Sequence, residues 1–254
     1  MMVNYQIDGP EHAPVVILSN SLGTTLEMWQ PQMPALTARY RVVRYDTRGH
    51  GGTRAAGNVD LAQLGLDVID LLDHLQIARA HFCGISMGGL TGLWLARYRP
   101  QRLLSATVIN SAARIGDEKG WRQRARTVRE EGLSAIAASA PERWFTPAFR
   151  QASPQIVSGL CQRLAESSAG GYAACCEALA KADMREAIAA ITLPVLLIAG
   201  QYDPVTTLAD AQLIQQRIVG AQLAVVPASH LSSIEVPESV NRALLYFLEE
   251  QYAG

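Results

Sequence analysis

The sequence of 254 residues has almost no net charge, no long apolar run and little cysteine, and each of these excludes a class of protein. The formal net charge is −1, so there is no excess of positive charge to neutralise phosphates, and we expect no nucleic-acid partner. No apolar run approaches the roughly 20 residues that span a bilayer, and the N-terminus has no basic start followed by an apolar stretch. We therefore expect neither membrane association nor a secretory signal.

The few cysteines follow no recognisable framework. The four cysteines are Cys83, Cys161, Cys175 and Cys176. No two of them form a CxxC motif, and their spacing matches neither a zinc site nor a disulfide framework. This scarcity favours a reducing, cytoplasmic setting. Hydrophobic residues make up 49% of the chain and charged residues 18%, which is typical of a globular protein rather than a disordered one.

Short apolar runs alternate with stretches of helical periodicity along most of the chain. Most of the runs are continuously apolar, which is typical of parallel strands covered on both faces. The expected strands are residues 15–20, 40–46, 81–85, 104–110, 193–199 and 221–226. The expected helices are residues 26–38, 61–75, 87–98, 208–218 and 237–250. This alternation predicts an α/β fold with a mostly parallel, doubly wound sheet.

The alternation is interrupted once. From about residue 111 to 191 there is no convincing strand, only helical segments punctuated by Pro and Gly, and this stretch is too long for a plain loop. We expect a core of residues 1–112 and 192–254 with an inserted helical cap, residues 113–191. Residues 111–155 hold eight basic and five acidic side chains, so this part of the chain is locally positive.

The sharpest local pattern is a G-x-S-x-G at residues 84–88, between an expected strand and an expected helix. A tight turn there would hold Ser86 in a strained conformation with its hydroxyl projecting from the sheet. The alternative is an ordinary glycine-rich turn in which Ser86 only caps the helix. We interpret Ser86 as a nucleophile.

A serine hydroxyl needs a base, and the base needs an orienting acid. His230 follows the last expected strand and Asp203 the one before, so both belong to loops at the carboxyl edge of the sheet, where α/β sites form. Asp203 could instead begin a turn or cap the next helix, and Asp210 is a weaker candidate for the acid. We predict a catalytic triad of Ser86, Asp203 and His230.

Acyl transfer also needs backbone donors for an oxyanion. The N–H of Met87 directly follows the nucleophile, and the N–H of Leu22 follows the first long strand, so these two are the expected oxyanion hole. Trp121 and Trp144, in the insertion, either wall a pocket or pack its helices. No residue set suggests a metal ligand group, and we expect no cofactor.

These residues together resemble the α/β-hydrolase superfamily, whose triads follow the same chain order. More narrowly, the chain is similar to the 3-oxoadipate enol-lactonases (β-ketoadipate enol-lactone hydrolases) of bacterial aromatic degradation, in blocks between about residue 4 and residue 248. The blocks are NSLGT at residues 20–24, Met28-Trp29, RYDTRGHG at 44–51, NSAARIG at 110–116, RWFTP at 143–147 and GYAACCEAL at 171–179. Many superfamily members have His-Gly where this chain has Asn20-Ser21.

The resemblance implies an α/β-hydrolase fold and the hydrolysis of 3-oxoadipate enol-lactone to 3-oxoadipate in the β-ketoadipate pathway, without metal or cofactor. It also implies a small anionic substrate, with contacts from Trp29, Trp121, Arg143 and Trp144. Which cap arginine would bind the substrate carboxylate is left open, and so is the oligomeric state, a homo-oligomer included. The alternatives are a carboxylesterase or carbon–carbon bond hydrolase of this fold, or a ligand receptor without turnover.

Overall fold

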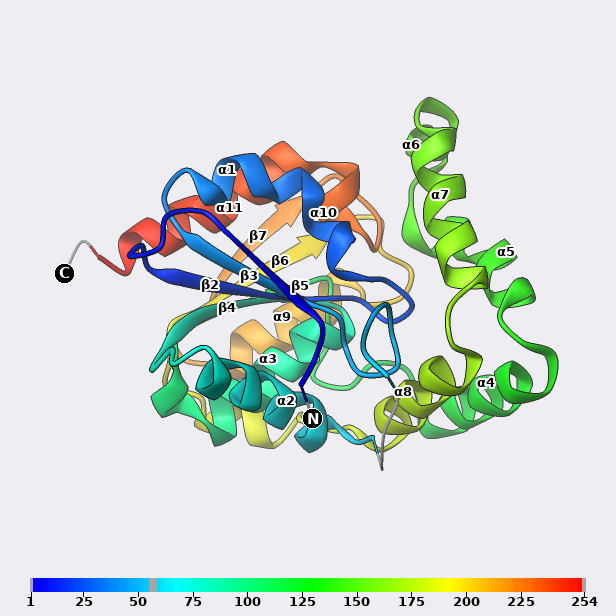
Figure 1. Ribbon diagram of the computed structural model, residues 1–254, viewed down its shortest axis with the longest axis horizontal. Coiled ribbons are helices and arrows are strands. Elements are labelled where there is room, and N and C mark those ends of the chain that lie inside the picture. The colour runs from blue at the N-terminus through cyan, green and yellow to red at the C-terminus, as the bar shows by residue number, and fades with distance from the viewer. Residues whose placement is uncertain (1, 55–58, 253–254) are drawn as a thin grey trace.

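A seven-stranded sheet runs through the computed structural model, which describes residues 2–54 and 59–252 (Figure 1). The strands are β1 (Tyr5–Asp8), β2 (Val15–Ser19), β3 (Arg41–Tyr45), β4 (Ala80–Ile85), β5 (Leu103–Ile109), β6 (Val195–Gly200) and β7 (Gln222–Val226). Their order in the sheet is β1-β3-β2-β4-β5-β6-β7. Strands β2 to β7 pair in parallel, whereas β1 pairs antiparallel with β3. The predicted α/β fold with a mostly parallel sheet is confirmed.

The sequence pattern did not predict β1. This strand has four residues at the edge of the sheet, and none of them is fully buried. A short, half-exposed edge strand lacks the continuous apolar run by which the central strands were found.

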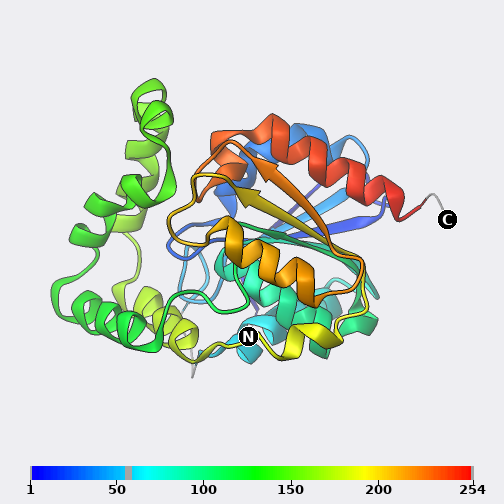
Figure 2. The ribbon, with the colours of Figure 1, turned by 180° about the vertical axis from the view of Figure 1, so that it is seen from behind.

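Helices cover both faces of the sheet (Figures 1 and 2). One face carries α1 (Met33–Thr37), α10 (Ser232–Glu235) and α11 (Pro237–Glu250), and the other carries α2 (Leu61–His74), α3 (Met87–Tyr98) and α9 (Leu208–Arg217). Short 3₁₀ helices are η1 (Leu26–Gln32), η2 (Pro100–Arg102) and η3 (Ala187–Ala190). The single helix expected over residues 26–38 is therefore wrong. It divides into η1 and α1, and Pro31 and Pro34 lie on either side of the division, where each removes a backbone donor.

Five α-helices, all within the described residues, lie between β5 and β6 in the chain and beyond the carboxyl ends of the strands (Figure 1). They are α4 (Glu118–Glu131), α5 (Ser134–Trp144), α6 (Pro147–Ala152), α7 (Pro154–Ala165) and α8 (Ala169–Lys181). Helix α4 packs on α8, and α5 packs on α7. The Met184 N–H donates to the Ala113 carbonyl at 2.8 Å, which ties the two ends of this segment together at its base. We call residues 113–191 the cap.

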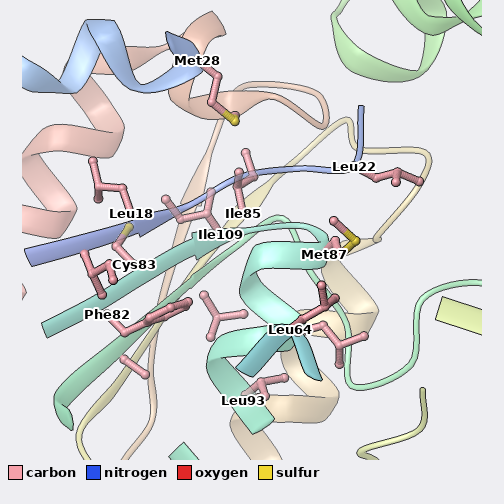
Figure 3. Packing of buried hydrophobic residues seen from close by; sticks show 14 of the residues in the cluster. Leu18, Leu22, Met28, Leu64, Phe82, Cys83, Ile85, Met87, Leu93 and Ile109 are labelled. Atoms are coloured by element: carbon pink, nitrogen blue, oxygen red, sulfur yellow. The ribbon is translucent and has the colours of Figure 1, made fainter. Parts of the chain in front are cut away.

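Large apolar side chains on the central strands and on α3 form the core (Figure 3). Leu18 on β2, Phe82 and Ile85 on β4, and Ile109 on β5 are each at most 1% exposed. Burying a side chain of this size stabilises the fold by about 1.5–3 kcal/mol. This packing fixes the strand ends from which the site is built. No helix in the part of the chain that the structure describes is long and apolar enough to cross a membrane.

Candidate active site

Ser86 occupies the turn between the end of β4 and the start of α3, and its backbone is strained. Its φ of 56° and ψ of −118° lie in a region that residues other than glycine rarely adopt. Two hydrogen bonds hold it there: the Ser86 N–H donates to the Ile109 carbonyl at 2.9 Å, and the Ser111 hydroxyl donates to the Ser86 carbonyl at 2.7 Å. The turn lifts the Ser86 hydroxyl off the edge of the sheet.

The two glycines of the G-x-S-x-G pattern are required by close backbone contacts. A Cβ on Gly84 would lie 2.2 Å from the Gly88 carbonyl oxygen, and a Cβ on Gly88 would lie 2.3 Å from the Ser19 carbonyl oxygen. Neither backbone atom can move aside without displacing a strand or a helix. The spacing of the pattern therefore follows from the tight approach of β2, β4 and α3 around Ser86.

Ser86, His230 and Asp203 form a hydrogen-bonded series. His230 Nε2 lies 2.9 Å from Ser86 Oγ, and His230 Nδ1 lies 2.8 Å from Asp203 Oδ2. All three residues are buried. A carboxylate only accepts hydrogen bonds, so Nδ1 carries the proton toward Asp203, and Nε2 is free to accept from the serine hydroxyl. This is the arrangement that lets an imidazole take a proton from a serine.

Asp203 is held by donors on both of its oxygens. Oδ1 accepts from the N–H groups of Val205 at 2.7 Å and Thr206 at 3.1 Å, and Oδ2 accepts from the Thr206 hydroxyl at 2.8 Å and Asn110 Nδ2 at 2.9 Å. Burial acts to raise the pKa of Asp203. The charge of His230 and the hydrogen bonds from His230, Asn110 and Val205 outweigh it, and they bring the pKa below its ordinary value. Asp203 therefore stays ionised.

Asn110 is a member of this network that sequence reasoning missed. It follows β5 with a left-handed φ of 42°. Its Nδ2 donates to Asp203 and, at 3.1 Å, to the Ser229 carbonyl, while its Oδ1 accepts from the Ser232 hydroxyl. Its place at the carboxyl end of a central strand, beside Ser86 and Asp203, is the signal that could have identified it.

Asp210, the weaker candidate for the acid, has a different task. Its Oδ2 accepts from the N–H of Thr207 at 2.7 Å and from the Thr207 hydroxyl at 2.8 Å, and it caps the start of α9. Its half-buried side chain is bonded to the start of this helix and not to His230.

Asn20 attaches the loop after β2 to the turn that carries Ser86. Its Oδ1 accepts from Trp29 Nε1 at 2.9 Å, its Nδ2 donates to the Tyr45 carbonyl at 2.8 Å, and its own carbonyl accepts from the Gly88 N–H at 3.1 Å. Trp29 is fully buried behind this loop and does not line the cavity beside Ser86. The prediction that Trp29 contacts substrate is therefore corrected: the indole supports the loop from within the core.

Leu22 and Met87 lie beyond the ends of the strands that carry Leu18 and Ile85 (Figure 3). Within the described residues, neither the N–H of Leu22 nor that of Met87 donates to another protein group. The next N–H of the loop, that of Gly23, donates to His50 Nε2 at 3.0 Å. Two backbone donors next to Ser86 are thus left for a ligand, which is what an oxyanion hole requires.

A cavity of about 310 Å³ lies between the core and the cap. The core contributes Ser86, His230 and Leu22 to its wall. The cap contributes apolar, aromatic and charged side chains, namely Ile115, Asp117, Trp121, Arg124, Arg143, Trp144, Tyr172 and Leu179. Trp121, Arg143 and Trp144 were predicted as substrate contacts, and all three face this cavity.

Two arginines of the cap meet at the cavity, and only Arg143 was expected there. Arg143 donates to the Ser139 hydroxyl at 2.7 Å, and burial together with the charge of Arg124 lowers its pKa. Arg124 lies over the Trp121 ring, 4.9 Å from its centroid. In the described part of the chain neither guanidinium pairs with a carboxylate. Asp117 also lines the cavity, but its side chain accepts from the Gly120 N–H at the start of α4. The two guanidinium groups, without a carboxylate partner, make this end of the cavity a place for an anion.

The described residues contain no group of three or more His, Cys, Asp or Glu side chains arranged to hold a metal ion. Cys83 lies three residues before Ser86 in the chain, but it is buried in the core. Burial there raises the pKa of its thiol and keeps it protonated. The chemistry available at this site is thus nucleophilic attack by Ser86 with His230 as its neighbouring base.

Comparison with known proteins identifies the family and the fold. Residues 14–237 match the model of the alpha/beta hydrolase fold family. The chain is 52% identical to 3-oxoadipate enol-lactonase 2 of Acinetobacter baylyi over 243 residues, covering 95% of this chain and 91% of that protein. It is also 52% identical to 3-oxoadipate enol-lactonase 1 of the same organism over 236 residues, covering 93% and 89%. The crystal structure of the enol-lactonase from Burkholderia xenovorans LB400 superposes with a TM-score of 0.95 at 42% identity, covering 97% of this chain and 96% of that one.

Proposed function

The chain belongs to the alpha/beta hydrolase fold family and, within it, to the 3-oxoadipate enol-lactonases, and we propose from this that it hydrolyses 3-oxoadipate enol-lactone to 3-oxoadipate through an acyl-enzyme on Ser86. The observation that carries the mechanism is the unbroken hydrogen-bonded series from Ser86 through His230 to Asp203. We assign the reaction to the β-ketoadipate pathway of aromatic degradation.

In the first step Ser86 Oγ attacks the lactone carbonyl while His230 Nε2 takes the hydroxyl proton. Asp203 stabilises the imidazolium that forms, because its carboxylate already accepts from Nδ1. The N–H groups of Leu22 and Met87 stabilise the oxyanion, and donors of this kind contribute about 3–4 kcal/mol each to such a transition state.

Collapse of the tetrahedral intermediate breaks the ring ester bond. The ring oxygen leaves as an enol and takes the proton that His230 holds, so the base that accepted this proton returns it. An enol leaves more easily than a simple alkoxide, and its conversion to a ketone draws the ring opening to completion. A water activated by His230 then cleaves the acyl-enzyme and restores Ser86.

The substrate is an anion, and the two cavity arginines provide the matching charge. A carboxylate that binds between Arg124 and Arg143 would satisfy two guanidinium groups that lack an acidic partner in the described structure. It would also relieve the repulsion between them. We therefore extend the earlier expectation of one cap arginine to this pair, with Trp121 and Trp144 enclosing the ring.

The test is a comparison of steady-state rates on the enol lactone, on a neutral aryl ester and on a substrate for carbon–carbon bond hydrolysis. We expect kcat/KM for the enol lactone to exceed that for the aryl ester by at least about two orders of magnitude, because only the lactone combines an enol leaving group with a carboxylate. A preference for either of the other substrates would replace the proposed function by a carboxylesterase or a carbon–carbon bond hydrolase. Absence of turnover on all three would favour a ligand receptor.

A further inference from the structure

The segment of the cap that carries Arg143 and Trp144 runs directly beside the loop that carries His230. The Leu231 N–H donates to the Trp144 carbonyl at 3.0 Å, and the Ser229 hydroxyl lies 3.4 Å from the Arg143 carbonyl. The two walls of the cavity that face the substrate are thus joined by hydrogen bonds on either side of His230.

The carboxylate of Glu235 also links these two segments. Glu235, the last residue of α10, accepts from the Ser229 N–H at 2.8 Å on one oxygen. Its other oxygen accepts from the Thr146 N–H at 3.2 Å and from the Thr146 hydroxyl. Ser229 directly precedes His230, and Thr146 follows Trp144 by two residues. Glu235 therefore holds one residue of each wall in a fixed relation to the other.

We propose that Glu235 is a positioning residue that clamps the cap segment of residues 143–146 to the His230 loop, so that the substrate-binding side chains and the base keep one alignment. The proposal rests on the proposed function, because it assigns Arg143 and Trp144 to the substrate and His230 to the chemistry. Glu235 itself does not line the cavity.

The clamp depends on the carboxylate as an acceptor on both oxygens. All three of its partners are N–H or O–H donors, and an ionised carboxylate offers acceptors alone. A glutamine of the same size would turn an NH₂ group toward either Ser229 or Thr146, so one donor would meet another donor. Hydrogen bonds to a charged group are stronger than those between neutral groups, so the loss of one can change the alignment of a loop.

The two walls do not depend on Glu235 equally. The His230 loop is also held to the core, because Asn110 Nδ2 donates to the Ser229 carbonyl and the Tyr202 N–H donates to the Ala228 carbonyl at 3.0 Å. Among the described residues, the hydrogen bonds that tie residues 143–146 to the core are those to this loop and to Glu235; the other hydrogen bonds of the segment, such as that of the Phe145 N–H to the Pro141 carbonyl, stay within the cap. Loss of the clamp therefore displaces Arg143 and Trp144 more than it displaces His230, and it weakens binding of the anionic lactone more than attack by Ser86.

The experiment compares wild type, Glu235→Gln and Glu238→Gln on the enol lactone and on a neutral aryl ester. Glu238 lies three residues further on, is exposed, and has no recorded hydrogen bond within the described residues, so Glu238→Gln is the matched control. For Glu235→Gln we expect KM for the lactone to rise about tenfold with kcat within about threefold of wild type, and kcat/KM for the ester to change less than about twofold. Glu238→Gln behaves as wild type.

A second pair of variants keeps the test independent of the folding of Glu235→Gln. Thr146→Val removes the hydroxyl bond to Glu235 and should raise KM for the lactone in the same direction, whereas Thr146→Ser keeps the bond and should restore the wild-type value. If Glu235→Gln shows the same lactone kinetics as Glu238→Gln, the clamp is overturned. It is also overturned if Glu235→Gln loses kcat equally on both substrates, because that is the effect of a residue that only stabilises the fold. A wild type that does not hydrolyse the lactone would instead overturn the proposed function.

Discussion

His230 Nε2 lies 2.9 Å from Ser86 Oγ, although 144 residues separate the two in the chain. The contact is possible because β4 and β7 run parallel, so that the loops after them leave the sheet on the same side. The cap covers this side of the sheet (Figure 1). Asp203 joins the series from the loop after β6.

Asp203→Asn should lower kcat for the enol lactone by about three to four orders of magnitude, because an amide cannot keep the Nδ1 proton of His230 in place. Asp210→Asn is the control. Since Asp210 only caps α9, that variant should retain its kcat and lose about 1 kcal/mol of unfolding free energy. Steady-state kinetics and urea denaturation measure both effects. A loss of less than tenfold for Asp203→Asn would remove Asp203 from the mechanism.

Arg143→Ala and Arg124→Ala should each raise KM for the anionic lactone by about tenfold to a hundredfold, because each removes a charged donor from the cavity. Kinetics on a neutral aryl ester should change little. Arg126→Ala, on the exposed side of α4, is the matched control and should leave both substrates unaffected. If the two cavity variants lose activity on the lactone and the ester alike, the arginines do not recognise the substrate charge.

Gly171 on α8 packs against the turn of residues 46–53, and Gly170 beside it does not. A Cβ on Gly171 would lie 2.1 Å from the Gly49 carbonyl oxygen, whereas the nearest atom to a Cβ on Gly170 is 4.0 Å away. Gly171→Ala should destabilise the protein by about 1–3 kcal/mol through this overlap. Gly170→Ala should be neutral or stabilising by less than about 1 kcal/mol. Thermal unfolding of the two variants decides the matter, and equal Tm values would contradict the packing described here.

His81 makes stability depend on pH. Burial, with a smaller effect of Arg79, lowers its pKa from the ordinary 6.5 to about 4, and its ring nitrogens contact the Ser105 hydroxyl at 2.8 Å and the Tyr252 hydroxyl at 2.5 Å. Between pH 6.5 and pH 4 the unfolded chain binds a proton that the folded chain does not. His81 should therefore reduce the unfolding free energy as the pH falls through this window, by roughly 3 kcal/mol at most.

Denaturant unfolding of wild type and His81→Gln at pH 7 and at pH 4.5 measures this dependence. The other histidines are common to both proteins, so their effect cancels in the difference. Wild type should lose stability relative to His81→Gln as the pH falls. Parallel pH dependence of the two proteins would show that His81 does not titrate on unfolding.

The sequence predicted the parts of the site that depend on local pattern. The bounds of α3 and α11 agree with the expected helices, because a strand end and a proline mark their starts. Ser86, Asp203 and His230 each follow a mostly apolar strand, and parallel strands end on the same side of the sheet. Three residues distant in the chain could therefore be placed together from the sequence alone.

The missed residues depend on how the cap packs on the core. Trp29 and Trp121 look alike in the sequence, yet the first lies in the core behind Asn20 and the second faces the cavity. Arg124 is one of many arginines in the cap, and only the packing of α4 on α8 turns it inward. Glu235 and Thr146 are separated by 89 residues, and no local pattern links them. Such contacts are set by tertiary packing rather than by periodicity.

The most direct test of the account is the rate of enol-lactone loss, followed by absorbance, for wild type and for Ser86→Ala at equal concentration. The account predicts that Ser86→Ala lowers kcat by about five to six orders of magnitude, because the nucleophile and the proton transfer to His230 are lost together. The melting temperature should stay close to that of wild type. Equal rates for the two proteins would contradict the assignment of Ser86 as the nucleophile and with it the acyl-enzyme mechanism.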